Sequence, residues 1–381
     1  MSGPVYRGLT WDHPRGYEAL EAAAEQARQR GEVNIVWERQ PLEGFEEHRI
    51  DELCAAYDIV VLDHPHIGQA VSLDCLIPLG SVFDAASLAK IRDRTIGPCF
   101  ESYDYADRQW ALPLDAATQV MAYRPDLIGQ APTSWEEVAD LAASRPMVLS
   151  LAGPHAALTL FSIALSIDPQ FAVDGRLFAR GVGEQAFKLM TLLFRRSAPV
   201  ARDLNPIGIL EMMAATRDIA LCPLIYGYVN YAGAQVAAPR RRLAFADAPV
   251  SNGGGRGSIL GGTGIALSKR CPVTPELIRH LAWLMDEDAQ VRFVPAHNGQ
   301  PSNRQAWADP QVNDAWGGFY RDTTATLEGA HVRPRYDGFI QFQHDAAQQV
   351  RLALTEAWRP ADAIAALESL FATSLPEGKQ R

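Results

Sequence analysis

The N-terminal part of the chain alternates short apolar strands with helices, and this order constrains the fold more than any other feature. Strands are predicted over Val5–Thr10, Glu32–Trp37 and Ile59–Leu62, and helices over Gly16–Gln29 and Glu46–Ala56. Repeated strand–helix–strand order predicts a mostly parallel sheet whose crossovers are right-handed. We therefore expect an α/β protein.

Two polar clusters directly follow predicted strands. Trp11–His13 follows the first strand, and Asp63–His66 (Asp-His-Pro-His) follows the third. In α/β sheets of this kind, ligands bind outside the carboxyl ends of the strands. The sequence therefore predicts a polar binding site at that edge of the sheet.

Length and charge exclude several classes of protein. The chain has 381 residues, about right for two domains, and 35 basic against 45 acidic side chains give a formal charge of −10. Such a surface repels nucleic acid unless a basic patch is concentrated somewhere, and the only dense basic run, Arg240–Arg242, is too short for that. We expect no nucleic-acid partner.

Neither a membrane span nor an export signal is predicted. The longest largely apolar stretch, Ala157–Ile167, falls short of the ~20 residues that a span needs, and we expect a buried helix there. Residues 1–16 lack the apolar segment of a signal peptide. We expect a cytoplasmic protein, or a periplasmic one if a signal has been removed.

The rest of the chain supplies further predicted elements. They are strands over Gln109–Pro113, Thr118–Tyr123, Ile219–Pro223 and Leu243–Ala246, helices over Ala156–Ile167, Glu184–Arg196, Ile207–Thr216 and Thr274–Met285, a helix start at Pro132–Glu137, and two terminal helices within Ala346–Leu370 that meet near Arg359 and Pro360.

The Gly261–Gly264 segment (Gly-Gly-Thr-Gly) is followed by a strand-like apolar run. A phosphate-binding glycine loop opens a helix instead, so this segment does not predict a nucleotide site. It predicts a tight turn that lets two backbones approach. Whether the turn also lines a ligand site is left open by the sequence.

Metal binding and nucleophilic catalysis are weakly supported. Asp63, His64 and His66 resemble part of a metal site, but no third histidine has a confirming spacing, and ligand contacts or packing are favoured instead. Cys75 or Cys99 could be a nucleophile beside a histidine, although a single cysteine near apolar residues is usually inert. We expect no metal, no cofactor and no enzymatic activity.

The aromatic side chains give a stronger indication of function. Trp11, Tyr226, Tyr228, Tyr231 and Trp307 are expected in loops close to Gly, Asp or Asn residues. Rings beside carboxylates and amides suit a sugar-like or planar polar ligand, and they equally suit the capping of a lobe surface. The position of Trp11 at a strand end favours the ligand.

Several segments in this order resemble the family 1 extracellular solute-binding proteins of ABC transporters, which include maltose-type and glycerol-phosphate-type binding proteins. The segments that carry the resemblance are Tyr57–Leu79, Trp110–Pro113, Val120–Leu127, Pro132–Leu141, Gly261–Ser268, Gly299–Arg304 and Pro334–Leu367.

The resemblance implies a type II periplasmic-binding-protein fold with a mostly parallel sheet in each of two hinged lobes. We expect lobe 1 over residues 1–117 and 262–320, and lobe 2 over residues 118–261 and 321–381. The implied function is capture of a small polar ligand by closure of the lobes, followed by recognition by an ABC permease, with the protein a monomer. The polar loops depart from the family pattern, so the ligand is a sugar, a polyol or a small oxyanion or carboxylate.

The residues expected in the binding cleft share a place at strand ends, in the glycine turn or in the loop after a strand. They are Trp11, Asp12, His13, Asp63, His64, Asp115, Tyr226, Tyr228, Gly262 and Arg304, with Arg335 and Tyr336 as secondary candidates. Two alternatives remain open: a thiaminase-like transferase or hydrolase that uses Cys75 with a nearby Glu, and a cytoplasmic ligand sensor.

Overall fold

The computed structural model describes residues 4–42, 44 and 48–376, and the chain forms two compact units. The first unit comprises Met1–Ala117, Gly261–Asp314 and Arg335–Asp337, and the second comprises Thr118–Leu260, Ala315–Pro334 and Gly338–Arg381. Each unit is therefore assembled from segments that are distant in the sequence.

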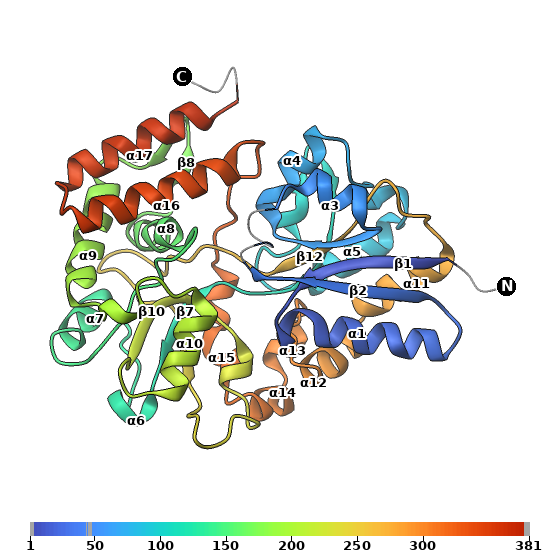
Figure 1. Cartoon of the computed structure of the whole chain (residues 1–381), viewed down its shortest axis with the longest axis horizontal. Coiled ribbons are helices and arrows are strands. Elements are labelled where there is room, and N and C mark those ends of the chain that lie inside the picture. The colour runs from blue at the N-terminus through green and yellow to red at the C-terminus, as the bar shows by residue number, and fades with distance from the viewer. Residues whose placement is uncertain (1–3, 43, 45–47, 377–381) are drawn as a thin grey trace. The chain divides into compact units, whose positions relative to one another are not determined.

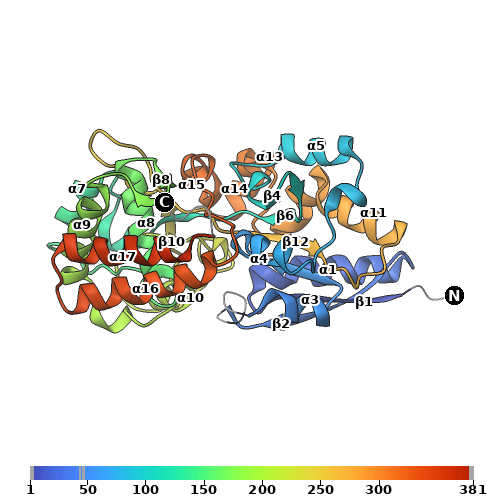
Figure 2. The same cartoon turned by 90° about the horizontal axis from the view of Figure 1, so that it is seen from above.

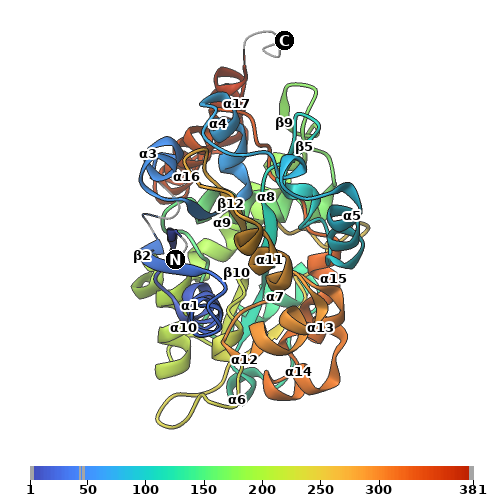
Figure 3. The same cartoon turned by 90° about the vertical axis from the view of Figure 1, so that its right-hand side faces the viewer.

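The first unit is an α/β structure. Its strands are β1 (Val5–Trp11), β2 (Asn34–Gln40), β3 (Ile59–Leu62), β4 (Asp104–Tyr105), β5 (Arg108–Gln109), β6 (Leu112–Asp115) and β12 (Thr263–Leu267). Its helices are α1 (Pro14–Gln29), α3 (Ile50–Ala56), α4 (Ile67–Ser72), α5 (Ala85–Arg94), α11 (Pro275–Leu284), α12 (Val294–Ala296), α13 (Arg304–Ala308) and α14 (Pro310–Ala315), with short 3₁₀ turns at His64–His66, Leu79–Ser81 and Glu101–Tyr103 and a π-helical turn at Ala289–Phe293. Helices α12, α13 and α14 lie side by side (Figure 3).

The main sheet of the first unit has the strand order β2-β1-β3-β12-β6. Strand β1 pairs in parallel with β2 and β3, whereas β12 pairs antiparallel with both β3 and β6. All strands except β12 therefore run in the same direction, and the mostly parallel sheet predicted for this part of the chain is present.

Side chains of β3 alternate between two hydrophobic clusters, one on each face of the sheet. Ile59 and Val61 join the cluster that contains α1 and α11, whereas Val60 and Leu62 join the cluster that contains α3 and α4. Figure 1 shows these two pairs of helices on opposite sides of the sheet. A strand that is buried on both faces must be apolar throughout, which explains the unbroken apolar run.

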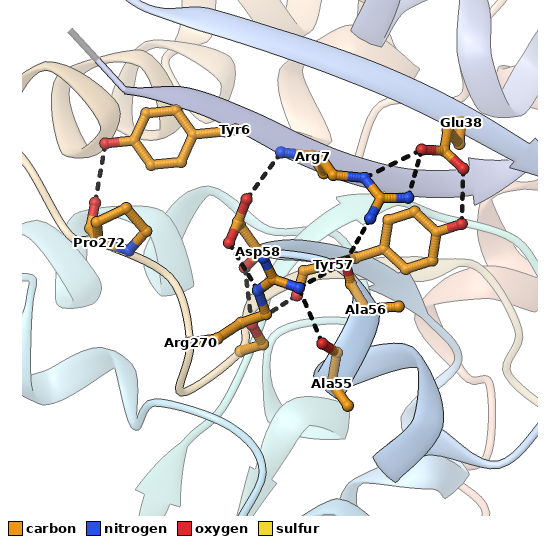
Figure 4. A network of polar contacts seen from close by, with 10 residues as sticks. Tyr6, Arg7, Glu38, Ala55, Ala56, Tyr57, Asp58, Arg270 and Pro272 are labelled. Atoms are coloured by element: carbon orange, nitrogen blue, oxygen red, sulfur yellow. Dashed lines mark hydrogen bonds and ion pairs between the residues drawn. The ribbon is translucent and has the colours of Figure 1, made fainter.

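A polar network fixes the amino edge of this sheet (Figure 4). The buried Asp58, just before β3, accepts a hydrogen bond of 2.8 Å from the backbone N–H of Arg7 on β1. Its other carboxylate oxygen accepts one of 3.1 Å from Nε of Arg270, which follows β12. One carboxylate therefore connects three strands of the sheet.

The same network extends along the backbone. Nη1 of Arg270 donates to the carbonyls of Ala55 and Ala56 at 2.8 Å, which satisfies the end of α3. Glu38 on β2 accepts hydrogen bonds from the Arg7 guanidinium and, at 2.8 Å, from the hydroxyl of Tyr57. These contacts hold the amino edge of the sheet together.

The second unit is also α/β. Its strands are β7 (Gln119–Tyr123), β8 (Phe171–Val173), β9 (Arg176–Phe178), β10 (Leu221–Tyr226) and β11 (Ala244–Ala246), and its helices are α6 (Pro125–Ile128), α7 (Trp135–Leu141), α8 (His155–Ile167), α9 (Val182–Arg196), α10 (Pro206–Ala215), α15 (Phe319–Glu328), α16 (Phe339–Thr355) and α17 (Pro360–Ser374), with 3₁₀ turns at Pro199–Ala201 and Val229–Tyr231.

The sheet of the second unit has the order β10-β7-β11, and both pairings are antiparallel. The prediction of a mostly parallel sheet is therefore wrong for this unit. The central strand β7 meets β10 and β11 only after long excursions of the chain, and both return in the opposite direction. Length and hydrophobicity of an apolar run carry no information about that direction.

Helices α8, α16 and α17 of the second unit pack through aromatic side chains. Helices α8, α9, α16 and α17 contact one another, and α16 and α17 lie side by side (Figure 2). The Phe161 and Phe342 rings of α8 and α16 are stacked with centroids 6.3 Å apart, and Phe342 meets Phe371 of α17 at 5.2 Å. As predicted, residues 157–167 belong to a buried helix.

Most predicted elements are present with shifted ends. The strand Ile59–Leu62 is confirmed at both ends, whereas the strand predicted at 32–37 lies at Asn34–Gln40. The helix predicted at 46–56 is described only over Ile50–Ala56, and residues 46 and 47 lie outside the described residues. The predicted strand at 109–113 is instead divided between β5 and β6.

No helix of the described chain is long and apolar enough to span a membrane.

Candidate functional site

The carboxyl edge of the first unit's sheet brings together several of the predicted site residues. Strand β1 ends at Trp11, β3 ends directly before Asp63, and β6 ends at Asp115. Strand β12 runs the other way and begins at Thr263, opposite Asp115, so Gly262 lies at the same edge. Four predicted site residues from four separate chain segments thus share one edge.

A buried ion pair occupies this edge. Nε of Arg15 donates a hydrogen bond of 2.8 Å to Oδ2 of Asp115, and its Nη2 donates to Oδ1. Only 4% of the Arg15 side chain and 5% of the Asp115 side chain are exposed. Two parallel bonds of this kind fix the orientation of both groups. The Arg15 guanidinium also lies 5.9 Å from the Trp11 ring centre.

His13 lies at the N-terminus of α1, and this position determines the hydrogen bond and the protonation state of its ring. Its Nδ1 accepts a hydrogen bond of 3.2 Å from the backbone N–H of Arg15, so the imidazole serves as the N-cap of the helix. Burial, with a smaller contribution from the Arg15 charge, lowers the pKa of His13 to about 3. A neutral ring can accept from one nitrogen and donate from the other.

Trp11 is packed on the start of α1. Gly16 lies against its ring so closely that a Cβ at this position would be 2.4 Å from the indole. The hydroxyl of Thr10 donates to the Gly16 carbonyl at 2.8 Å and holds the helix against β1. The ring belongs to the same hydrophobic cluster as α1 and α11.

The two carboxylates of the polar clusters differ in accessibility. Asp12 is 60% exposed and lies 3.7 Å from Nη1 of Arg39. Asp63 is 18% exposed and caps the 3₁₀ turn that follows β3, since its Oδ1 accepts from the His64 N–H at 2.8 Å. The Asp12 carboxylate is the more open of the two to solvent.

His64 is completely buried beside Asp63. Its Nδ1 lies 3.1 Å from Oδ1 of Asp63, and its ring meets the Tyr103 ring edge-on with centroids 6.3 Å apart. The Tyr103 hydroxyl donates to the Leu62 carbonyl at 3.4 Å. This arrangement suits a buried histidine that packs against Asp63 and holds its carboxylate in place. The sequence had left such a packing role open as the alternative to a metal ligand.

The glycine turn matches its prediction. Gly262 has φ +83°, and a Cβ there would lie 2.3 Å from the Asp115 carbonyl oxygen. The Gly261 N–H donates to the Ala117 carbonyl at 2.8 Å. Two backbones therefore approach at this point, and the strand β12 follows at once.

The remaining candidates of the first unit lie on two further segments. Arg304 is the exposed first residue of α13, after Pro301, which bridges to Asp115. Arg335 donates to the carbonyls of Glu101 and Ser102 at 2.6 and 3.0 Å, and its half-buried neighbour is Tyr336. Burial lowers the pKa of Arg335.

In the second unit, Tyr226 and Tyr228 lie in different local structures. Tyr226 ends β10, its ring meets His155 edge-on at 5.8 Å, and its hydroxyl donates to the Leu260 carbonyl at 3.4 Å. Tyr228 lies beyond Gly227, directly before a 3₁₀ turn. The hydroxyl of Tyr231 in that turn donates instead to Glu211 at 2.9 Å, and burial raises its pKa.

The whole chain resembles solved structures of transport-associated binding proteins. Maltose-bound MalE3 of T. maritima superposes with a TM-score of 0.80 at 16% identity, covering 97% of this chain and 100% of that one. The ribitol complex of an ABC transporter solute-binding protein from Agrobacterium radiobacter has a TM-score of 0.79 at 19% identity, covering 97% and 98%. The chain has the solute-binding-protein fold.

A further structure extends this similarity. An ABC transporter solute-binding protein from Agrobacterium vitis with bound D-mannitol superposes with a TM-score of 0.74 at 15% identity, covering 97% of both chains. No family model and no curated protein matches the sequence. These similar structures are binding proteins, and none is described as an enzyme.

Within the solute-binding-protein fold, three aromatic residues differ from expectation. Trp11, Tyr226 and Trp307 were expected in loops, but Trp11 is the last residue of β1, Tyr226 is the last residue of β10 and Trp307 lies in α13. Nε1 of Trp307 donates to the Pro301 carbonyl at 2.8 Å, so this ring holds the turn before α13. Polar residues next to these positions made them resemble loops, because the ends of strands and helices are rich in polar residues, as loops are.

Sequence reasoning missed Arg15 as a member of the site. A cation in the first turn of a helix is unfavourable, since the amino end of the helix carries a partial positive charge. An arginine at this position therefore indicates a carboxylate partner. That partner, Asp115, is 100 residues away, and no local pattern identifies it.

The alternative based on Cys75 finds little support. The carboxylates that affect its thiol are Asp51 and Asp74, not the nearby glutamate that this alternative requires. Among the residues that the structure describes, no group of three His, Cys, Asp or Glu side chains could hold a metal ion.

Proposed function

We propose that this chain is the solute-binding component of an ABC transporter and that it captures a small polyhydroxylated ligand. The observation that carries the proposal is similarity of fold over nearly the whole chain to proteins solved with maltose, ribitol and D-mannitol. Those ligands are neutral and rich in hydroxyl groups. A sugar or polyol is therefore favoured over an oxyanion or carboxylate.

The chemistry of the carboxyl edge supports a neutral ligand. Carboxylate oxygens accept hydrogen bonds from hydroxyl groups, and Asp12 and Asp63 retain exposed surface. The only cation buried at this edge, among the described residues, is Arg15, and Asp115 already neutralises it. An anionic ligand would meet two carboxylates without a free buried cation.

We propose that all ten candidate residues belong to the ligand-binding site, some by contacting the ligand and others by positioning those that do. The buried Trp11 packs against Gly16 and positions the start of α1. Asp12 and Asp63 accept hydrogen bonds from ligand hydroxyl groups, the neutral His13 donates from Nε2, and the Arg15–Asp115 pair orients the edge. From the second unit, Tyr226 and Tyr228 supply aromatic faces for the C–H surface of a sugar. His64 and Gly262 position the loops, and Arg304 adds donors.

We further propose that the two units close on the ligand and that a membrane permease recognises the closed form. A ligand shifts such an equilibrium only through contacts that it makes better in one state than in the other. Residues from both units therefore need to contribute. This partner would place the working protein outside the cytoplasmic membrane.

The test is binding to a defined panel. Ribitol, D-mannitol, maltose and D-tagatose form one arm, and inorganic phosphate and succinate form the other, each measured by calorimetry and by the shift in Tm. A ligand at a hundred times its Kd stabilises the folded state by about 2.7 kcal/mol. Binding of a polyhydroxylated compound, but not of the anions, supports the proposal, and binding of the anions alone contradicts it.

Variants locate the site within the same experiment. Asp12→Asn and Asp63→Asn keep the size of each side chain but remove an acceptor charge, so each should weaken binding about tenfold or more. Asp93→Asn is the matched control, because Asp93 is an exposed carboxylate that pairs with neighbouring Arg92. Unchanged affinity in both site variants would remove these residues from the site.

A further inference from the structure

The first unit has a pocket of about 330 Å³ between α1 and α11. These two helices lie on the same face of the main sheet (Figure 1). The most deeply buried residues that line the pocket are Ala23 and Ala27 of α1 and His280 of α11, and Trp283 lies one turn further along α11. All the lining residues belong to the first unit. A pocket of this volume suits a small ligand.

The pocket is separate from the carboxyl edge of the sheet. Its α1 residues lie in the second half of that helix and just beyond it, whereas Arg15 of the carboxyl edge lies at the start. Because an α-helix rises 1.5 Å per residue, Arg30 lies about 20 Å along the helix axis from Arg15. A small molecule in the pocket would therefore not contact the carboxyl edge.

Two rings of α11 form an aromatic wall of the pocket. The ring centroids of His280 and Trp283 are 6.1 Å apart, and the ring planes are inclined by 36°. Trp283 also meets the Phe293 ring edge-on with centroids 5.2 Å apart, which restrains its orientation. Planar apolar surface beside the methyl groups of Ala23 and Ala27 favours a flat, partly apolar ligand.

His280 adds a polar requirement to this wall. The residue is only 7% exposed, and its Nε2 is buried without a hydrogen-bond partner from the described part of the chain. Buried polar atoms are generally paired, because an unpaired one lowers stability. An unpaired nitrogen on a side chain that lines a pocket therefore indicates an occupant with polar groups.

The end of α1 holds two opposite charges at the rim of the pocket. The backbone N–H groups of Arg30 and Glu32 donate to the carbonyls of Gln26 and Ala27 at 3.1 and 3.0 Å, and Gly31 between them has φ +68°. These bonds fix both residues at the helix end. Both are exposed, and neither forms an ion pair with any residue that the structure describes.

The other two charges of the rim neutralise each other. Nη2 of Arg279 lies 2.8 Å from Oε1 of Glu276, one turn earlier on α11. The rim therefore has one cation and one anion without a counter-ion. A simple carboxylate would be attracted by Arg30 but repelled by Glu32, and a simple amine would experience the reverse. A ligand with both charges complements the two side chains.

We propose that this pocket binds a free aromatic amino acid, with its ring against Trp283 and its carboxylate and ammonium groups paired with Arg30 and Glu32. The proposal is independent of polyol capture, because it uses no residue of the carboxyl edge. The aromatic wall and the two unpaired rim charges together carry it.

The test measures binding to the folded wild-type chain by calorimetry. L-phenylalanine and L-tryptophan are the probes, and we expect at least one to bind with a Kd of about 1 mM or tighter. Three compounds each lack one feature of the ligand: 3-phenylpropionate lacks the ammonium group, phenethylamine lacks the carboxylate and glycine lacks the ring. Each should bind about threefold more weakly or worse. Failure of both probes to bind, or equal affinity for 3-phenylpropionate and L-phenylalanine, would overturn the proposal.

Charge variants locate the binding site. Arg30→Gln and Glu32→Gln each remove one rim charge from an exposed side chain, so each should weaken binding of the amino acid about threefold or more. Arg28→Gln is the matched control, because Arg28 lies on the same helix, pairs with Glu25 and does not line the pocket. Unchanged affinity in both rim variants would contradict the assigned charges.

A further pair of variants tests the aromatic wall. Trp283→Leu should weaken binding about tenfold, and Trp358→Leu, which replaces a half-buried tryptophan of the second unit, should not. Circular dichroism confirms that both variants are folded. Asp12→Asn distinguishes the two proposed sites, because it should leave binding of the amino acid unchanged. Loss of amino-acid binding in Asp12→Asn, with normal binding in Trp283→Leu, would place the ligand at the carboxyl edge and overturn the proposal.

Discussion

Arg15 at the start of α1 and Asp115 at the end of β6 form a two-point ion pair that is almost completely buried. The pair joins the first helix of the first unit to an edge strand of its sheet. It also replaces solvent around two charges that would otherwise be costly to bury. The carboxyl edge is therefore held by side chains, independently of any ligand.

Removing one partner of this pair should be strongly destabilising. Asp115→Ala leaves the Arg15 guanidinium buried without its carboxylate, so we expect the free energy of unfolding of the first unit to fall by about 3–5 kcal/mol. Urea denaturation followed by fluorescence measures the change. Glu25→Ala disrupts the exposed pair with Arg28 and should have little effect. Equal effects of the two substitutions would mean that the buried pair contributes nothing beyond a surface pair.

Gly262 should tolerate no side chain. An alanine there would combine a left-handed backbone with a Cβ 2.3 Å from the Asp115 carbonyl oxygen, so Gly262→Ala should cost about 2–4 kcal/mol. Gly181→Ala provides the control, because Gly181 has a left-handed backbone with φ +80° but open space around its Cα. That variant should cost only about 1 kcal/mol. Thermal unfolding of both variants measures the contribution of the close approach, and similar losses would argue against it.

The buried His280 of α11 should make stability depend on pH. Burial lowers the pKa of His280 from 6.5 to about 4, so the folded chain keeps the ring neutral where the unfolded chain binds a proton. The stabilisation is complete above pH 6.5 and is lost as the pH falls towards 4. The full difference corresponds to roughly 3 kcal/mol.

Replacing His280 with an uncharged side chain should flatten this dependence. His280→Gln should reduce the slope of unfolding free energy against pH between pH 6.5 and 4, measured by urea denaturation at several pH values. The control is His48→Gln, since His48 is exposed. If the His280→Gln profile parallels that of the wild type, another group accounts for the pH dependence.

Asp58 should be the critical residue of the network at the amino edge. Asp58→Ala removes the acceptor for both the Arg7 N–H and Arg270 Nε, and we expect a loss of about 2–4 kcal/mol. Glu38→Ala removes a half-exposed acceptor of the same network and should cost much less. Chemical denaturation compares the two variants. A larger loss in Glu38→Ala would show that the network depends on its exposed part.

The sequence predicted the elements of the first unit well because their signals are local. Ile59–Leu62 had to be apolar on both faces, and this fixed the strand and its burial. The Gly262 turn was also recognisable, because glycines directly before a strand indicate a close backbone approach. Patterns of this kind depend on neighbouring residues, so they are visible without the structure.

The relationships that depend on distant residues were not predictable. The residues next to Arg15 in the sequence do not identify Asp115 as its partner. The sequence of β7 likewise does not indicate that both of its partner strands run antiparallel to it. The exposure of candidate side chains was equally hidden. Asp12 and His13 are adjacent in the chain, yet the carboxylate is open to solvent while the imidazole is buried against a helix end.

The sheet order of the first unit also has a consequence for synthesis on the ribosome. Strand β6 occupies an edge of this sheet, and its ladder partner β12 emerges roughly 150 residues later. At translation speeds of about 5–20 residues per second, β6 is synthesised roughly 8–30 s before β12. During that interval the apolar edge strand β6 is unpaired in the nascent chain. A chaperone that shields apolar strands would therefore bind the nascent chain at β6.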